Sequence, residues 1–240
     1  MKKLIAGNWK MNMNTESAKA FDQAMAKVDE KIVEWLICPP YPYIQHITNT
    51  KRGAQDCSAY YSGAFTGEVS ASMLADIQCD YCIVGHSERR AEAHCETSDI
   101  VRQKAQLVID NGMTAIVCVG ETLEEREEGK AFDIVEGQLL KSIPNDTRPD
   151  NCVIAYEPVW AIGTGKAATS CDVSNMHNYI REILKSNVAD GEEMRILYGG
   201  SVKPDNAAEL LNIDNVDGAL IGGASLKAED FIAIGKAVES

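Results

Sequence analysis

The segment TAIVCVG at residues 114–120 contains five consecutive apolar side chains and shows no alternation of apolar with polar residues. A strand with one face in water alternates, so an unbroken apolar run indicates a strand covered on both faces, as in a parallel sheet. The segments SDIVRQKAQLVIDN (98–111) and FDIVEGQLLKSI (132–143) flank this strand and place apolar residues three and four positions apart. This spacing predicts amphipathic helices on either side of the strand.

The same alternation of strand and helix extends along the chain. The segment GAQD is the weakest strand candidate and would not be predicted on its own. The predicted strands are KLIAGN (3–8), IVEWLIC (32–38), GAQD (53–56), YCIVG (81–85), TAIVCVG (114–120), CVIAYEP (152–158), RILYGG (195–200) and GALIGG (218–223). Besides the two helices above, the helical patterns are TESAKAFDQAMAKV (15–28), VSNMHNYIREILKS (173–186), DNAAELL (205–211) and AEDFIAIGKAV (228–238).

Eight strand–helix units over 240 residues average 30 residues each, and no proline-rich linker or charge block divides them. This organisation predicts an α/β protein that forms one closed, parallel, eight-stranded (β/α)₈ barrel domain over residues 1–240. An open doubly wound sheet would be expected to follow its first strand with G-x-G-x-x-G, and AGNWKMN (6–12) lacks that pattern.

Charge and composition exclude several classes of partner. The formal net charge is −13, which disfavours binding to nucleic acid and to anionic lipid. No apolar run approaches the length of a membrane span, and the apolar stretch in MKKLIAGNWKMN (1–12) is too short for a signal peptide. We therefore expect a cytoplasmic protein whose eight cysteines are reduced.

Polar residues and glycines cluster after the predicted strands, where the active site of such a barrel lies. Asn8 and Lys10 follow the first strand, His86 and Glu88 follow the fourth, and Glu157 ends the sixth. Taken singly, Lys10 could be a surface lysine, His86 a core histidine and Glu157 a member of a salt bridge at the rim. Their joint occurrence at one predicted rim favours a catalytic site.

Three glycine-rich loops at the same rim predict a site for an anion. They are GTG (163–165), YGGS (198–201) and IGGA (221–224). Glycines leave backbone N–H groups uncovered, Ser201 adds a hydroxyl donor, and the loops after the seventh and eighth strands are the usual phosphate site of this barrel. A phosphate monoester is therefore a reasonable ligand. A zinc site at Cys79, Cys82, His94 and Cys95 is the competing interpretation, but Cys82 lies inside an apolar run and no second histidine follows His94 at the required spacing.

Six segments, in this order, resemble the triosephosphate isomerase family, and the resemblance extends from about residue 3 to residue 235. They are NWKMN (8–12), GHSERR (85–90), CVGE (118–121), YEPVWAIGTGK (156–166), YGGSV (198–202) and GALIGGASL (218–226). The resemblance implies interconversion of dihydroxyacetone phosphate and glyceraldehyde 3-phosphate through an enediol(ate), as in glycolysis and gluconeogenesis, without metal or cofactor.

The resemblance also implies a role for each matching residue. Glu157 would be the base, His86 the electrophile that polarises the carbonyl, and Lys10 the cation beside the developing oxyanion. Asn8 would orient the substrate, Glu88 would pair with Lys10, and Cys118 would help to place Glu157. The phosphate would be held by Gly163, Ser201, Gly222 and Gly223. A helix beginning after His86 would lower the pKa of the imidazole and keep it neutral.

Two further features are implied by the resemblance. Residues 158–168 would form a mobile lid whose closure brings Ile162, with Leu220, over the carboxylate and expels water. Residues 62–70, with Thr66 at the tip, would reach a partner subunit near Lys10 and Met11 to form a homodimer. Asp56 departs from the asparagine usual in the family, and a carboxylate there could either pair with a cation or weaken association at high pH.

Two alternatives remain open at this point. The chain could be another barrel isomerase or lyase acting on a phosphorylated sugar, which would share the phosphate loops without needing Lys10, His86 and Glu157 together. It could also be a binding or scaffold protein that kept the fold without turnover.

Overall fold

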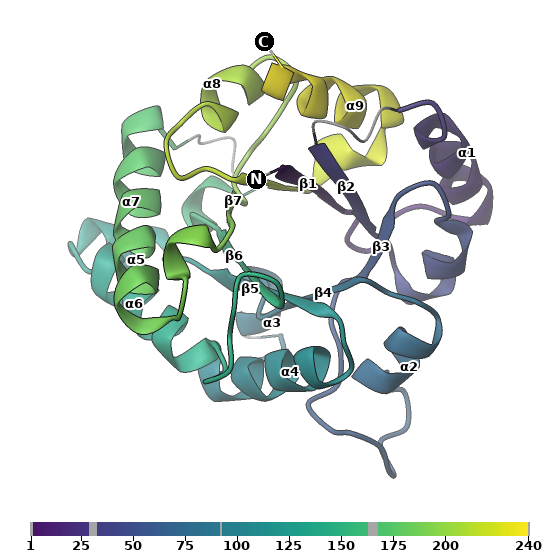
Figure 1. Cartoon of the computed structure of the whole chain (residues 1–240), viewed down its shortest axis with the longest axis horizontal. Coiled ribbons are helices and arrows are strands. Elements are labelled where there is room, and N and C mark those ends of the chain that lie inside the picture. The colour runs from purple at the N-terminus through teal and green to yellow at the C-terminus, as the bar shows by residue number, and fades with distance from the viewer. Residues whose placement is uncertain (1, 29–32, 92, 163–167, 240) are drawn as a thin grey trace.

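The computed structural model describes residues 2–28, 33–91, 93–162 and 168–239, and its strands form a closed parallel barrel in the order β1 to β8 (Figure 1). Each strand pairs with its neighbours in the sequence, and β8 closes the barrel against β1 through Leu4–Gly218 and the following pairs. The strands are β1 (Lys3–Asn8), β2 (Val33–Cys38), β3 (Lys51–Ala54), β4 (Tyr81–Val84), β5 (Thr114–Val119), β6 (Cys152–Tyr156), β7 (Ile196–Tyr198) and β8 (Gly218–Ile221). The predicted fold class is confirmed.

Helices surround the barrel as an outer ring (Figure 1). The α-helices are α1 (Thr15–Met25), α2 (Ala71–Asp76), α3 (Ser87–Arg90), α4 (Ser98–Asp110), α5 (Leu123–Glu127), α6 (Ala131–Ser142), α7 (Ser170–Asn187), α8 (Ala207–Leu211) and α9 (Ala228–Lys236). Short 3₁₀ turns are η1 (Tyr41–His46), η2 (Val159–Ala161), η3 (Gly191–Glu193), η4 (Gly223–Leu226) and η5 (Ala237–Glu239). No helix in the described segments is long and apolar enough to cross a membrane.

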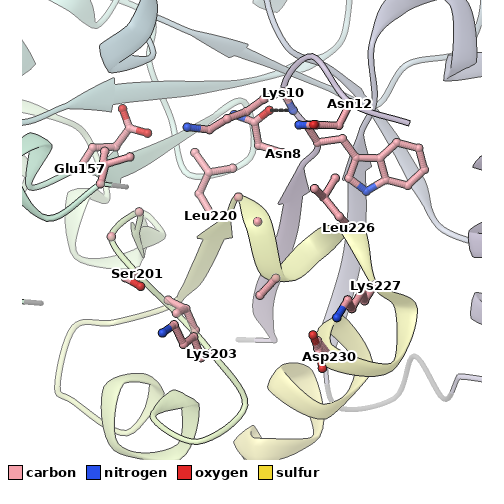
Figure 2. A pocket seen from close by; sticks show the side chains of 18 of the residues that line it. Asn8, Lys10, Asn12, Glu157, Ser201, Lys203, Leu220, Leu226, Lys227 and Asp230 are labelled. Atoms are coloured by element: carbon pink, nitrogen blue, oxygen red, sulfur yellow. Dashed lines mark hydrogen bonds between the residues drawn. The ribbon is translucent and has the colours of Figure 1, made fainter. Parts of the chain in front are cut away.

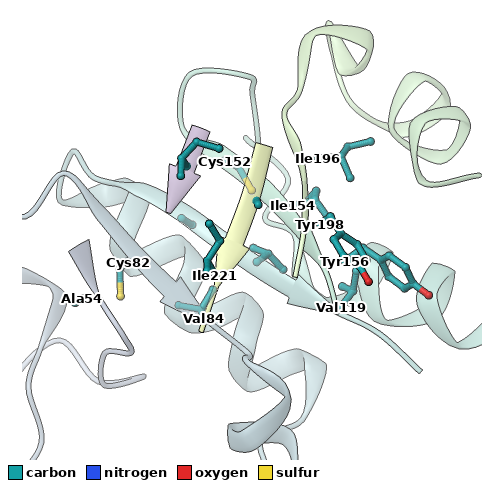
Figure 3. Packing of buried hydrophobic residues seen from close by; sticks show 14 of the residues in the cluster. Ala54, Cys82, Val84, Val119, Cys152, Ile154, Tyr156, Ile196, Tyr198 and Ile221 are labelled. Atoms are coloured by element: carbon teal, nitrogen blue, oxygen red, sulfur yellow. The ribbon is translucent and has the colours of Figure 1, made fainter. Parts of the chain in front are cut away.

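Both faces of the strands are buried, which is why their sequences are continuously apolar. In β5, Ile116 and Cys118 belong to the layer that fills the barrel, whereas Ala115, Val117 and Val119 pack outward against the helices. Figure 3 shows part of the outer layer, including Val84, Ile154 and Ile221. Within the strands these two layers are apolar, so the polar groups of the predicted site lie at the strand ends.

The strand β3 differs from its predicted position. It spans Lys51–Ala54 rather than residues 53–56, and its partners are Leu36 and Ile37 on β2 and Tyr81 and Cys82 on β4. The strand is hard to find in the sequence because its pairing relies on backbone groups and on a small residue. A β-carbon at Gly53 would lie 2.4 Å from the Cys38 sulfur, so the barrel admits no side chain there.

Candidate active site

A cavity of about 730 Å³ opens where the carboxyl ends of the strands meet. Residues predicted for the site from the sequence line it: Asn8, Lys10, His86, Glu157, Ser201, Gly222 and Gly223. In Figure 2 the Lys10 side chain extends toward Glu157, and Ser201 lies on a separate loop. The parallel barrel thus brings side chains that are distant in the sequence to one mouth.

Lys10 is fixed on both its backbone and its ammonium group. Its backbone N–H donates to Asn8 Oδ1 at 3.0 Å, and its carbonyl accepts from the Gln55 side chain at 2.9 Å. Its φ is 51°, in the left-handed region that a lysine rarely adopts. Its Nζ lies 2.7 Å from Glu88 Oε1, as the sequence comparison with the family implied.

His86 and Glu157 are in direct contact. His86 Nε2 lies 2.9 Å from Glu157 Oε1, and the Ser87 backbone N–H donates to Glu157 Oε2 at 2.9 Å. Both side chains are buried, at the carboxyl ends of β4 and β6. The imidazole and the carboxylate therefore hold each other in place within the same cavity.

The hydrogen bonds of His86 select a tautomer. His86 caps the four-residue helix α3, and the Glu88 backbone N–H donates to its Nδ1 at 3.2 Å. An imidazolium has no free lone pair at Nδ1, so this bond favours the neutral ring with its hydrogen on Nε2. That hydrogen faces Glu157 and the cavity.

The charge balance at this pair differs from the expected lowering of the His86 pKa. Burial does lower it, but the Glu157 carboxylate raises it by more, and the pKa of His86 lies above its ordinary value. Burial raises the pKa of Glu157, but His86, the Ser87 N–H and Lys10 bring it below the ordinary value. The shift in each residue thus depends on contact with the other.

Cys118 occupies the interior face of β5 beside Glu157. Its thiol is fully buried, and burial followed by the nearby Glu157 carboxylate raises its pKa well above the ordinary value. The thiol therefore stays protonated and packs as a small neutral group.

The side of the cavity predicted to bind phosphate is formed by loops after β7 and β8. Ser201 is half-buried, Gly223 is exposed, and a β-carbon at Gly223 would meet no other atom within 4 Å. Gly163 and the other residues of 163–167, within the predicted lid (158–168), lie outside the described residues. Lys203, which the sequence analysis did not select, also lines the cavity; a cation directly after YGGSV was the available signal.

Residues just before and at the start of the predicted lid are anchored to the buried Glu121 carboxylate. The Trp160 indole N–H donates to Glu121 Oε1 at 2.8 Å, and Tyr156 OH donates to the same oxygen at 3.1 Å. The Arg126 guanidinium lies 4.8 Å from the centre of the Trp160 ring. Trp160 thus packs against Glu121 and Arg126 at the base of the loop.

Asp56 pairs with cations. Lys104 Nζ lies 2.7 Å from Asp56 Oδ1 and 2.6 Å from Glu96 Oε1, and Arg89 contacts the same two carboxylates at 2.9 and 2.7 Å. Of the two outcomes considered for this position, the structure shows the ion pair. At the alternative zinc positions, Cys82 is fully buried on β4 and Cys95 is exposed, and the described residues contain no metal-binding group of three or more His, Cys, Asp or Glu side chains.

Comparison with known proteins agrees with this geometry. The family model described as Triosephosphate isomerase matches residues 3–238. The chain is 51% identical to triosephosphate isomerase of Bradyrhizobium sp. (strain ORS 278), covering 97% of this chain and 96% of the relative. It is 50% identical to that of Rhizobium etli (strain ATCC 51251 / DSM 11541 / JCM 21823 / NBRC 15573 / CFN 42), covering 99% and 96%.

A solved structure shows the same architecture. The crystal structure of triosephosphate isomerase from Bartonella henselae superposes with a TM-score of 0.93 at 42% identity, covering all of both chains. The family is one of isomerases, which decides against the lyase and scaffold alternatives. With a family model spanning nearly its full length and relatives at half identity, this chain belongs to the triosephosphate isomerase family.

Proposed function

We propose that this chain interconverts dihydroxyacetone phosphate and glyceraldehyde 3-phosphate with Glu157 as the base. The observation that supports this most directly is the 2.9 Å contact between His86 and Glu157 in a cavity that Lys10 also lines. The reaction moves one proton from C1 to C2 and one from the C1 hydroxyl to the C2 oxygen, with no net oxidation and no group transferred, so it consumes no redox cofactor or group carrier.

The proton to be removed lies next to a carbonyl and is only weakly acidic. A carboxylate takes it readily only when the enolate oxygen is stabilised in the same step. The Nε2 hydrogen of His86 and the Lys10 ammonium both face the cavity, while Asn8 supports Lys10 and Glu88 pairs with it. These groups supply a donor and a positive charge for the developing oxyanion.

Substrate changes the balance between His86 and Glu157. When Glu157 leaves the ring for the substrate carbon, the main cause that raises the pKa of His86 is removed, while burial and Lys10 continue to lower it. The imidazole then acts as a neutral donor, whose acidity lies closer to that of the enediol. Cys118 fills the space behind Glu157 and helps to direct the carboxylate.

The phosphate is held by Ser201, Gly222 and Gly223, with Gly163 joining from a lid over residues 158–168. The uncovered backbone at Gly222 and Gly223 is suited to anion binding. Closure would place Ile162 and Leu220 over the carboxylate, and desolvation raises the basicity of Glu157. Both residues line the same cavity in this structure.

The base is tested with Glu157→Gln in a coupled assay on glyceraldehyde 3-phosphate. We expect kcat to fall by roughly 10²–10⁴ while KM stays within a few-fold, because a general base contributes about that factor. The matched control is Glu182→Gln, which changes an exposed carboxylate on α7 and should leave kcat unchanged. Unchanged turnover in Glu157→Gln would refute the assignment.

The cytoplasmic homodimer formed through residues 62–70 is part of the same proposal. This loop projects away from the barrel between β3 and α2 (Figure 1), and Phe65 stacks on Tyr60 at 3.9 Å between ring centres. A separate cavity of about 250 Å³ near Lys10 is lined by Met11, which is 95% exposed. An exposed methionine beside a cavity suits an inserted loop.

Sedimentation velocity tests this association. Thr66→Arg places a charge at the loop tip and should shift the dimer toward monomer, whereas Asn175→Arg on the exposed outer surface of α7 should not. Identical sedimentation of Thr66→Arg and the unmodified protein over a dilution series would rule out this loop as the interface.

A further inference from the structure

The guanidinium of Arg90, at the end of α3, makes four hydrogen bonds to four different elements of the barrel. Its Nε donates to Gly85 O at 2.8 Å, and its Nη2 donates to Cys118 O at 3.0 Å. The remaining two bonds reach the hydroxyls of Ser98 on α4 and Ser142 on α6, both at 3.0 Å. One side chain therefore joins the ends of β4 and β5 to two outer helices.

All four acceptors are uncharged. Within residues 2–28, 33–91, 93–162 and 168–239, Arg90 forms no ion pair with a carboxylate, unlike its neighbour Arg89. Because no carboxylate neutralises the guanidinium, its positive charge still acts on other charged groups nearby. Burial lowers the pKa of Arg90, and the nearby Glu157 carboxylate opposes this shift.

The bond to Gly85 acts where the chain turns from β4 into α3. Gly85 has a φ of +67°, and a β-carbon there would lie 2.7 Å from Val101 and 3.0 Å from Arg90 Nη2. The next two residues are His86, which contacts Glu157, and Ser87, whose N–H binds Glu157 Oε2. By holding the Gly85 carbonyl, Arg90 therefore holds the turn that orients His86 and Ser87 toward Glu157.

The bond to the Cys118 carbonyl holds the strand that lies beside Glu157. Cys118 lies on β5, and its thiol adjoins Glu157. Arg90, Cys118 and Glu157 also line a second cavity of about 240 Å³, which shares Glu157 with the larger cavity. The guanidinium thus lines, together with Glu157, a space that admits a small solute.

We propose that Arg90 is a positioning residue for the isomerase reaction. Through its bonds to Gly85 and Cys118 it keeps His86 and Ser87 at the correct distance and orientation from Glu157. It touches neither the substrate nor the reacting atoms. The inference rests on the proposed roles of Glu157 and His86, and it adds a residue whose contribution is independent of the phosphate loops.

Arg90→Ala should lower kcat by roughly 10²-fold, because a displacement of about 1 Å at the reacting groups costs that factor. KM should stay within about three-fold, since Ser201, Gly222 and Gly223 are on other loops. The matched control is Arg148→Ala, whose exposed side chain contacts Asp150 and should leave kcat and KM unchanged. A kcat for Arg90→Ala within three-fold of the unmodified protein would overturn the proposal.

Chemical rescue separates positioning from general destabilisation. Guanidinium chloride at about 50 mM, far below denaturing concentrations, should restore at least ten-fold in kcat to Arg90→Ala by entering the vacated position. Sodium chloride and methylammonium chloride at the same concentration should not, because neither offers the planar array of N–H donors. An inactive, folded Arg90→Ala that responds equally to all three salts would also overturn it.

Arg90→Lys keeps the test decisive if the alanine variant fails to fold. Lysine retains the charge but cannot reach four acceptors in one plane, so kcat should fall with KM unchanged. A lysine variant with full kcat would show that the guanidinium geometry is not needed. Glu157→Gln is assayed in parallel: activity in that variant would refute the proposed base, whereas its inactivity beside a fully active Arg90→Ala would refute only the role of Arg90.

Discussion

Gly120 packs so closely against Glu157 that a β-carbon at residue 120 would lie 1.7 Å from the Glu157 backbone oxygen. Hydrogen bonds to the backbone of Gly120 and to that of Glu157 hold this contact in place. The Gln138 side chain exchanges two hydrogen bonds with the Gly120 backbone at 2.8 and 3.0 Å, and the Glu157 N–H donates to Val119 O at 2.8 Å. The backbone of the proposed base is therefore seated directly on the end of β5.

Gly120→Ala should displace Glu157 and lower kcat by at least roughly 10²-fold. The clash is with backbone and cannot be relieved by a rotamer change, so the free energy of unfolding should also fall by about 1–3 kcal/mol. The control is Gly137→Ala in α6, where a β-carbon would meet nothing within 4 Å. That variant should be as stable as the unmodified protein or more so by up to about 1 kcal/mol in urea unfolding. Equal kcat values for the two variants would contradict the argument.

Lys10→Ala and Lys10→Gly both remove the ammonium group and should both lose most activity. They should differ in stability, because residue 10 has a φ of 51° and alanine retains the left-handed strain that glycine avoids. We expect the glycine variant to be more stable than the alanine variant by about 1 kcal/mol, measured by urea unfolding. A more stable alanine variant would show that the strain is relaxed elsewhere.

Lys104→Met should destabilise the fold strongly. Lys104 is 4% exposed and neutralises Asp56 and Glu96, so its loss leaves two buried carboxylates with Arg89 alone. Breaking a buried ion pair in this way lowers the free energy of unfolding by about 3–5 kcal/mol. Lys185→Met, which removes an exposed lysine paired with Glu182, should cost less than about 1 kcal/mol. Similar losses in the two variants would be inconsistent with a structural role for this network.

The stability of the protein should fall in mild acid because of His177. Burial lowers the pKa of His177 to about 4, although its Nδ1 bond to Asn215 O opposes the shift. Between the ordinary pKa of about 6.5 and this value, the unfolded chain binds a proton that the folded chain does not. The free energy of unfolding should therefore fall by about 3 kcal/mol as the pH drops through this window, with no further loss from His177 below it.

The variant His177→Asn isolates this contribution. The asparagine amide can donate to Asn215 O in place of Nδ1, but it does not titrate. Chemical unfolding at a series of pH values should show a shallower dependence between about pH 6.5 and 4 than in the unmodified protein. Parallel curves for the two proteins would assign the acid sensitivity to other groups.

The sequence by itself determined the barrel and the mouth at which its polar residues meet. The unbroken apolar runs, such as TAIVCVG at 114–120, required strands covered on both faces, and parallel strands place all their carboxyl ends at one rim. Asn8, His86 and Glu157 follow directly from that rule, because each stands at or just beyond the end of a strand.

Only the tertiary structure decided which of these groups touch and what supports them. Arg90 and Ser142 are 52 residues apart, and Asp56 and Lys104 are 48 apart, so no local pattern could pair them. The raised pKa of His86 likewise depends on a carboxylate from another strand rather than on its own short helix. Hydrophobic periodicity reports which face of an element is buried, whereas hydrogen bonds and ion pairs depend on distances of a few ångströms that are set only when the barrel closes.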